Sequence, residues 1–304
     1  CRKNQPALYL KELLNHQVER REGKGNTVFL QAPDVKNGVG GLRDYQGILW
    51  MAKVKFNLEN LDGLMHKKYL SEQEANSFED AYSFLLRVRN ELHFRSNRPV
   101  DTLHLEKQPE IALGLGYPQE DIFRRVEAFM GDYYAKAQSI HQICGILEER
   151  LVHASSGNTS KLSFRNVLNA YRSPPSQKVD GFDLIEDTLF SPSPNIFDDD
   201  PEKLIRLFRH SQRLNAKLSP NLRALVRNRL SLIDSALINS SSANVTFRSI
   251  LQEVGNVSPI LYEMHELGVL GRFVPEFGRL SCKVQHDLYH RFTADVHVLH
   301  CLTK

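Results

Sequence analysis

The strongest constraint on the fold is a long apolar stripe between Asp121 and Leu151. Apolar side chains recur there at steps of three and four residues, the spacing that places them on one face of an α-helix turned toward a core. They are Ile122, Val126, Phe129, Tyr133, Ala137, Ile140, Cys144, Leu147 and Leu151. This pattern predicts a helical bundle. Because Cys144 lies on the stripe, we interpret it as a buried apolar residue and not as a reactive thiol.

Other segments also favour helices. Ser71-Glu-Gln-Glu74 has the form of a capping box, which predicts a helix running to about Leu92. Asp200-Pro201 combines an N-cap residue with a proline suited to the first helical turn. Two more helical patterns cover Asn221–Leu237 and Thr246–Leu267. The best strand signal is Thr27–Gln31, so the expected fold class is mainly α with little strand.

Composition excludes several classes of protein. A net charge of +3 gives no case for nucleic-acid binding, and no apolar run approaches the roughly 20 residues that span a bilayer. Cys1, Cys144, Cys282 and Cys301 are scattered and contain no CxxC pair, which is typical of a reducing cytoplasm. The chain begins at Cys1 in place of Met and ends at Lys304 inside a histidine-containing segment, so we expect a piece of a longer protein.

The sharpest motif is the glycine-rich segment from Ala32 to Asp44, which follows the predicted strand and precedes a helical run. Glycines permit close backbone approach, and exposed amides at a helix start favour phosphate. Lys36 and Arg43 could add positive charge, while Asp34 and Asp44 could coordinate a metal ion or orient Arg43. The alternative is a tight strand-to-helix turn in which Asp44 pairs with Arg43 or caps the helix.

Several segments, in this order, resemble bacterial PII-protein uridylyltransferases. They are Pro33-Asp-Val-Lys36, Gly40-Gly-Leu-Arg-Asp44, Leu86-Arg-Val-Arg-Asn-Glu-Leu-His93, Leu113-Gly-Leu-Gly-Tyr117, Phe129-Met-Gly-Asp-Tyr-Tyr134, Leu267-Gly-Val-Leu-Gly-Arg-Phe-Val-Pro-Glu-Phe277 and Gln285-His-Asp-Leu-Tyr-His290. The resemblance covers nearly the whole chain and is weakest between about 154 and 197. It implies a helical bundle with a small β remnant of a nucleotidyltransferase core near the N-terminus, followed by a second helical unit.

The resemblance also implies domain boundaries. Residues 1–57 would be the C-terminal edge of the nucleotidyltransferase core, and residues 58–153 the helical PII-uridylyltransferase domain. Residues 154–197 would form an irregular linker, because they are rich in serine and proline. Residues 198–304 would be a helical region that leads into the start of an HD domain.

The family attaches UMP from UTP to a tyrosine of the PII signal protein with Mg²⁺, and glutamine is its usual signal. By resemblance, Asp44 is an accessory catalytic carboxylate. The implied nucleotide-binding residues are Lys36, Gly38, Gly40, Gly41, Arg43, Arg87 and Asn90. Arg87 and Asn90 lie near Arg89 and His93 on the predicted helix, and all four could face nucleotide phosphates. The alternative is a solvated or salt-bridged face, and the resemblance favours Arg87 and Asn90 over His93. The family's Gly-Ser motif and Asp-x-Asp pair are not present in this sequence, so we expect the isolated chain to be inactive.

The family's second activity removes UMP through an HD domain. His297 matches its first metal ligand, whereas the doublet His286-Asp287 corresponds to a similar doublet that precedes the HD domain. A lone histidine cannot form a catalytic metal site. Two alternatives remain open: an adenylyltransferase that acts on glutamine synthetase, and a non-catalytic helical module that docks a signalling protein.

Overall fold

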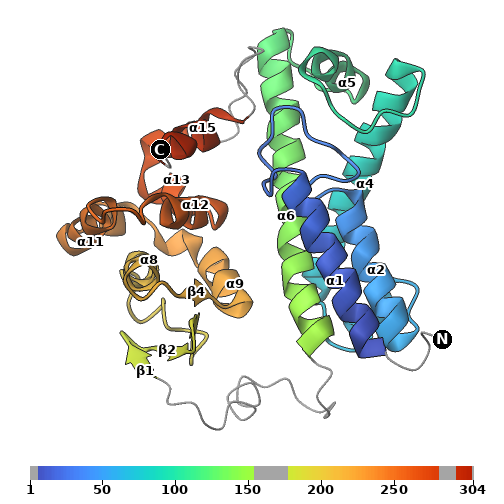
Figure 1. The fold of residues 1–304 in the computed structure, drawn as a ribbon. Coiled ribbons are helices and arrows are strands. Elements are labelled where there is room, and N and C mark those ends of the chain that lie inside the picture. The colour runs from blue at the N-terminus through green and yellow to red at the C-terminus, as the bar shows by residue number, and fades with distance from the viewer. Residues whose placement is uncertain (1–5, 154–176, 281–291, 303–304) are drawn as a thin grey trace. The chain divides into compact units, whose positions relative to one another are not determined.

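The computed structural model describes residues 6–153, 177–280 and 292–302, and the chain divides into two compact units. The described part of the first unit is 6–153 with 292–294. The described part of the second is 177–280 with 295–302. Both units are built mainly from helices, so the mainly α fold class is confirmed (Figure 1).

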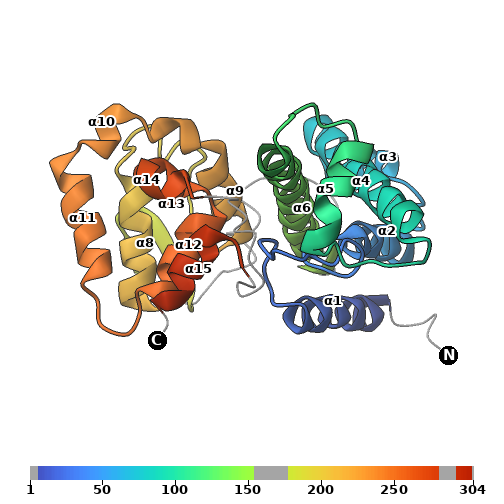
Figure 2. The same cartoon turned by 90° about the horizontal axis from the view of Figure 1, so that it is seen from above.

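The first unit is a helical bundle around one long helix. Its elements are α1 (Pro6–Gly23), α2 (Leu42–Phe56), α3 (Leu61–His66), α4 (Glu72–Ser96), the 3-10 turn η1 (Leu105–Lys107), α5 (Gln108–Gly114) and α6 (Ile122–His153). The apolar stripe predicted a helix over 121–151, and α6 confirms it. Helix α6 packs against α1, α2, α4 and α5, and α1 lies alongside α2 (Figure 2).

The predicted capping box at Ser71 is present at the start of α4. The Ser71 hydroxyl accepts from the amide of Glu74 at 3.2 Å, and the Glu74 carboxylate accepts from the amide of Ser71 at 2.8 Å. These two bonds satisfy donors that a helix start would otherwise leave open. The helix ends at Ser96 and is capped by Asn97, whose positive φ of 49° is the left-handed conformation common after a last turn.

A four-stranded sheet opens the second unit, in the order β1 (Gln177–Val179), β2 (Phe182–Ile185), β3 (Thr188–Phe190) and β4 (Lys217–Leu218). The first three strands are antiparallel and β4 joins β3 in parallel. Asp180 and Gly181 form the two-residue turn between β1 and β2, with φ of 52° and 88°. Positive φ at both positions matches the tight hairpin turn whose twist suits paired strands.

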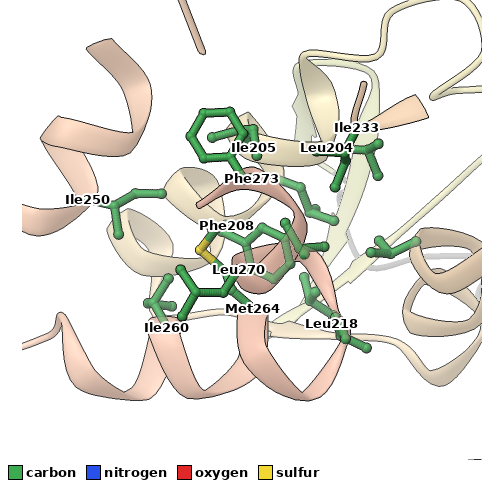
Figure 3. Packing of buried hydrophobic residues seen from close by; sticks show 14 of the residues in the cluster. Leu204, Ile205, Phe208, Leu218, Ile233, Ile250, Ile260, Met264, Leu270 and Phe273 are labelled. Atoms are coloured by element: carbon green, nitrogen blue, oxygen red, sulfur yellow. The ribbon is translucent and has the colours of Figure 1, made fainter. Parts of the chain in front are cut away.

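The helices of the second unit enclose a single apolar core. They are α8 (Lys203–Leu214), α9 (Pro220–Asn228), the 3-10 turn η2 (Leu230–Leu232), α10 (Ser235–Ile238), α11 (Ser241–Leu251), α12 (Ser258–Glu266), α13 (Val269–Phe273), α14 (Pro275–Gly278) and α15 (Ala294–Cys301). Phe208 of α8, Met264 of α12 and Leu270 of α13 gather in this core (Figure 3). Each is at most 3% exposed, so α8 is covered by the later helices.

The structure differs from the sequence predictions at several elements. At the predicted strand 27–31 it has an isolated bridge between Leu30 and Phe292, and the four-stranded sheet lies at 177–218 instead. Part of the predicted irregular linker, 177–190, therefore forms strands. Helix α8 begins at Lys203, and Asp200 accepts from Arg206 instead of capping it. The patterns over 221–237 and 246–267 each break into shorter helices.

The predicted boundary at residue 57 separates segments that share one compact unit, because α2 packs on both α4 and α6. Among the described helices, none combines the length and apolar character needed to cross a membrane.

Candidate functional site

Asp34 organises the first half of the glycine-rich segment. Its Oδ1 atom accepts from the backbone amides of Lys36 at 3.1 Å and Asn37 at 2.7 Å. Its Oδ2 atom lies 2.9 Å from Nζ of Lys24. An aspartate that binds amides two and three residues ahead closes a local turn. The carboxylate predicted as a metal ligand therefore has both oxygens engaged.

The same segment pairs with the chain that follows α4. The amide of Val35 donates to the carbonyl of Asp101 at 2.8 Å, and the amide of Leu103 donates to the carbonyl of Pro33 at 2.9 Å. These two bonds form an antiparallel bridge between Asp34 and Thr102. The glycine-rich segment is thus fixed from one side before α2 begins.

Gly40 brings the segment against α6. Its φ is +68°, and a Cβ atom at this position would lie 1.9 Å from the carbonyl oxygen of Ala137. At Gly41 a Cβ would lie 2.9 Å from the carbonyl oxygens of Gly38 and Val35. Only glycine fits such contacts. Close packing within the chain therefore accounts for these glycines, without a phosphate ligand.

The amides of the segment also donate within the chain. Gly40 donates to Oδ2 of Asp44 at 2.7 Å. The remaining bonds run from Gly38 to Asp34 (2.8 Å), Gly41 to Gly38 (3.0 Å), Leu42 to Val35 (3.0 Å) and Arg43 to Lys36 (3.0 Å), in each case to a carbonyl oxygen. Contacts with a phosphate at this segment would consequently come from the side chains of Lys36 and Arg43, and Arg43 is exposed.

Asp44 sits at the centre of a buried ionic network that we call the Asp44 network: Arg20, Arg21, Asp44 and Glu148. Oδ1 of Asp44 accepts from Arg20 and, at 2.9 Å, from Nε of Arg21. Arg21 also donates two bonds to Glu148, at 3.0 and 2.6 Å. The Asp44 side chain is 0% exposed, and those of Arg21 and Glu148 are 8% and 9% exposed. The network joins α1, the start of α2 and α6.

Protonation in this network follows from burial and pairing. Burial alone lowers the pKa of Arg21, but the hydrogen bond to Glu148 and the charge of Asp44 outweigh it, so the pKa is raised. For Glu148 burial dominates and raises the pKa, although Arg21 opposes the shift. The arginine stays charged, and its charge opposes the effect of burial on Glu148.

Asp34 and Asp44 do not fit the Mg²⁺ that the family resemblance implies. Magnesium binds free carboxylate oxygens in a near-octahedral shell, whereas these carboxylates already accept from lysine, arginine and amide donors. Within the described residues, no group of three or more His, Cys, Asp or Glu side chains is placed to hold a metal ion. The accessory catalytic role of Asp44 stays a prediction.

The structure separates the four candidate residues of α4 into two pairs. Arg87 and Asn90 are exposed, and the Arg87 guanidinium lies 5.7 Å from the ring centre of Phe84. Arg89 and His93, one turn apart on another face, contact Asp101 instead, as does Lys36. The structure thus brings Lys36 together with Arg89 and His93.

In the second unit, His297 is exposed on α15. Two residues earlier, the buried Asp295 lies 3.3 Å from Nε2 of the buried His265 on α12. The doublet His286-Asp287 lies outside the described residues. The predicted role of His297 as a first HD ligand remains a prediction.

The sequence suggested Arg43 as the partner of Asp44, but the arginines that donate to Asp44 are Arg20 and Arg21 of α1. One available signal was Glu148, which is one turn beyond Cys144 and therefore falls on the buried face of α6. A carboxylate on such a face requires a cation. Arg20-Arg21 is the adjacent basic pair at the end of α1 that supplies it. Asp101 had no comparable signal, because it follows α4 in an irregular segment.

Two protein-family models match the chain, each inside one of the compact units. The model described as GlnD PII-uridylyltransferase matches residues 9–148. The model described as uridylyltransferase GlnD third domain matches residues 182–273. Both describe parts of nucleotidyltransferase enzymes. The chain belongs to the GlnD PII-uridylyltransferase family.

Curated relatives agree with this assignment, and each is named bifunctional uridylyltransferase/uridylyl-removing enzyme. The relative from Bradyrhizobium sp. strain BTAi1 is 32% identical over 95% of this chain and 31% of its own length. The Rhodopseudomonas palustris relative is 33% identical over 95% and 31%, and the Azospirillum brasilense relative 34% over 91% and 29%. The chain therefore spans about a third of the length of these relatives. No solved structure matches it.

Proposed function

We propose that this chain forms the helical middle of an enzyme that transfers UMP from UTP to a tyrosine of the PII signal protein. A second activity, in an HD domain, would remove the UMP. One observation carries the proposal: the two family models match in order, and relatives with both activities in their name align over more than nine tenths of the chain. The proposed partners are PII, UTP and Mg²⁺, with glutamine as effector.

The 304-residue chain by itself would catalyse neither step. Nucleotidyl transfer needs carboxylates that hold a divalent metal against the triphosphate, and the oxygens of Asp34 and Asp44 are engaged in contacts within the chain. A single exposed histidine, His297, does not make a metal site. The chain would instead supply scaffold and binding surface.

A labelling assay tests this proposal. PII protein, Mg²⁺ and UTP labelled at the α-phosphate are incubated with this chain, or with the whole Azospirillum brasilense relative as the positive control. We expect label on PII with the relative and none with the chain. Labelling by the chain alone would overturn our account of the active site. Absence of labelling by the relative under glutamine-free conditions would remove the basis for UMP transfer as the function.

The engaged carboxylates also favour a second candidate, a helical module that binds PII without chemistry. Binding of unmodified PII to the chain, measured without UTP or metal, separates this candidate from an enzyme part that acts only when joined to a catalytic core. Parallel arms with labelled ATP and glutamine synthetase test the adenylyltransferase alternative. The predicted cytoplasmic location stays a prediction.

A further inference from the structure

Four side chains meet where the glycine-rich segment, α4 and the segment after α4 come together; we call them the Asp101 cluster. Arg89 donates from Nε to Oδ1 of Asp101 at 2.7 Å, and Nε2 of His93 lies 3.3 Å from the same atom. Nζ of Lys36 lies 3.7 Å from Oδ2 of Asp101. The four side chains are between 23% and 34% exposed, so the cluster is partly buried and open to solutes.

The cluster holds more positive than negative charge. Lys36 and Arg89 share the single carboxylate of Asp101, even before any proton on His93 is counted. Another carboxylate of the glycine-rich segment, Asp34, is paired with Lys24. Arg43, whose amide donates to the carbonyl of Lys36, carries a further positive charge on an exposed side chain. Partial burial strengthens the attraction of such an excess for an anion.

The donors of the cluster are incompletely used. Among the described residues, Nε is the one guanidinium nitrogen through which Arg89 donates, which leaves the two terminal nitrogens and their four N–H groups. The Lys36 ammonium pairs with Asp101 at a separation longer than a hydrogen bond. A planar guanidinium with a terminal nitrogen pair suits the bidentate geometry of phosphate oxygens, and a nearby ammonium suits a second phosphoryl group.

We propose that Lys36 and Arg89, with His93 beside them, bind two adjacent phosphoryl groups, either as inorganic pyrophosphate or as part of a nucleoside triphosphate. Asp101 holds the two cations in position when the anion is absent. Its carboxylate is suited to this role, because burial raises its pKa but the bond and charge of Arg89, with His93 and Lys36, outweigh burial and keep it ionised. The backbone bridge between Pro33–Val35 and Asp101–Leu103 fixes the distance between Lys36 and α4.

Calorimetric titration of the full 304-residue chain with inorganic pyrophosphate at low salt tests the site. We expect Lys36→Gln and Arg89→Gln each to weaken binding by about tenfold or more, since each removes a charge-assisted contact. Asp101→Asn removes the competing carboxylate and should tighten binding. The control is Lys53→Gln on α2, which deletes the same charge from the pair that Lys53 forms with the exposed Glu59 beyond the end of that helix. Circular dichroism confirms that each variant is folded.

The arms of the experiment separate the sources of the phosphoryl groups. If UTP displaces pyrophosphate and Lys36→Gln also weakens the binding of UTP, the site binds the polyphosphate of a nucleotide. If pyrophosphate binds and UTP does not displace it, the site binds the free anion. No binding of either at millimolar concentration overturns the proposal. Equal affinities of the Lys36→Gln and Lys53→Gln variants would overturn it too. The UTP arm rests on the proposed function, but the pyrophosphate arm measures binding without transfer and can succeed or fail independently.

Discussion

The Asp44 network gives a sharp prediction about stability. The substitution Asp44→Asn keeps the shape of the side chain but removes its charge, so Arg20 and Arg21 are left with Glu148 as their one acidic partner in the network. Removing one partner of a buried ion pair costs about 3–5 kcal/mol, because the remaining charge stays buried and unpaired. We expect a loss of that size, since Asp44 is 0% exposed and accepts three bonds.

The matched control is Asp80→Asn. Asp80 on α4 pairs with Lys136 on α6, but its side chain is 62% exposed. A surface pair of this kind contributes at most about 1 kcal/mol. Both substitutions delete one carboxylate charge from the same unit, so the difference between them isolates the effect of burial.

Urea unfolding followed by tryptophan fluorescence reports the stability of the first compact unit, because the chain's single tryptophan, Trp50, lies on α2. With a urea m value of about 2 kcal/mol/M, the Asp44→Asn midpoint should fall by about 2 M and the Asp80→Asn midpoint by at most about 0.5 M. Midpoints that agree within error would refute the view that the Asp44 network holds α1, α2 and α6 together.

Three further predictions follow from the first unit. Gly40→Ala should prevent stable folding, since its Cβ would clash with the α6 backbone. The control Gly116→Ala, also at positive φ but in open space, should lower the free energy of unfolding by about 1 kcal/mol in a thermal melt. The pKa of Asp101 is lowered in the folded chain, so its contribution to stability is present above about pH 4 and is lost as the pH falls through the folded pKa. Asp101→Asn should therefore reduce the dependence of the unfolding free energy on pH between about pH 5 and pH 2, measured by urea titration. Ser71→Ala should lower stability by about 1 kcal/mol through loss of the capping box, against little change for the exposed mid-helix Ser83→Ala in the same melting experiment.

Periodicity and capping chemistry predicted the first unit well, because both are local properties of the chain. The stripe through Phe129 and Leu147 predicted α6 within two residues at each end, and Ser71 marked the start of α4. The small sheet of the second unit was missed, although Asp180-Gly181 is a recognisable hairpin turn between short β-rich runs. The surrounding serines and prolines favoured an irregular segment.

The candidate site was less predictable, because its contacts join distant segments. The motif identified Gly40 and Asp44 as candidate site residues. Its sequence does not indicate whether a ligand or another helix occupies the space beside them. That space is filled by the backbone of α6 at Ala137. Likewise, helical spacing alone did not distinguish Arg87 from Arg89, since the choice depends on where Asp101 lies.

Helix α6 makes two contacts whose separation is set by helix geometry. The backbone of Ala137 packs against Gly40, and Glu148, 11 positions later, accepts hydrogen bonds from Arg21. Eleven residues are slightly more than three whole turns and about 16.5 Å of rise, so both contacts fall on the same side of the helix. Inserting or deleting one residue between them would rotate one contact by about 100° away from its partner. Chains that keep both contacts can therefore vary in sequence along this stretch, but they cannot vary in its length.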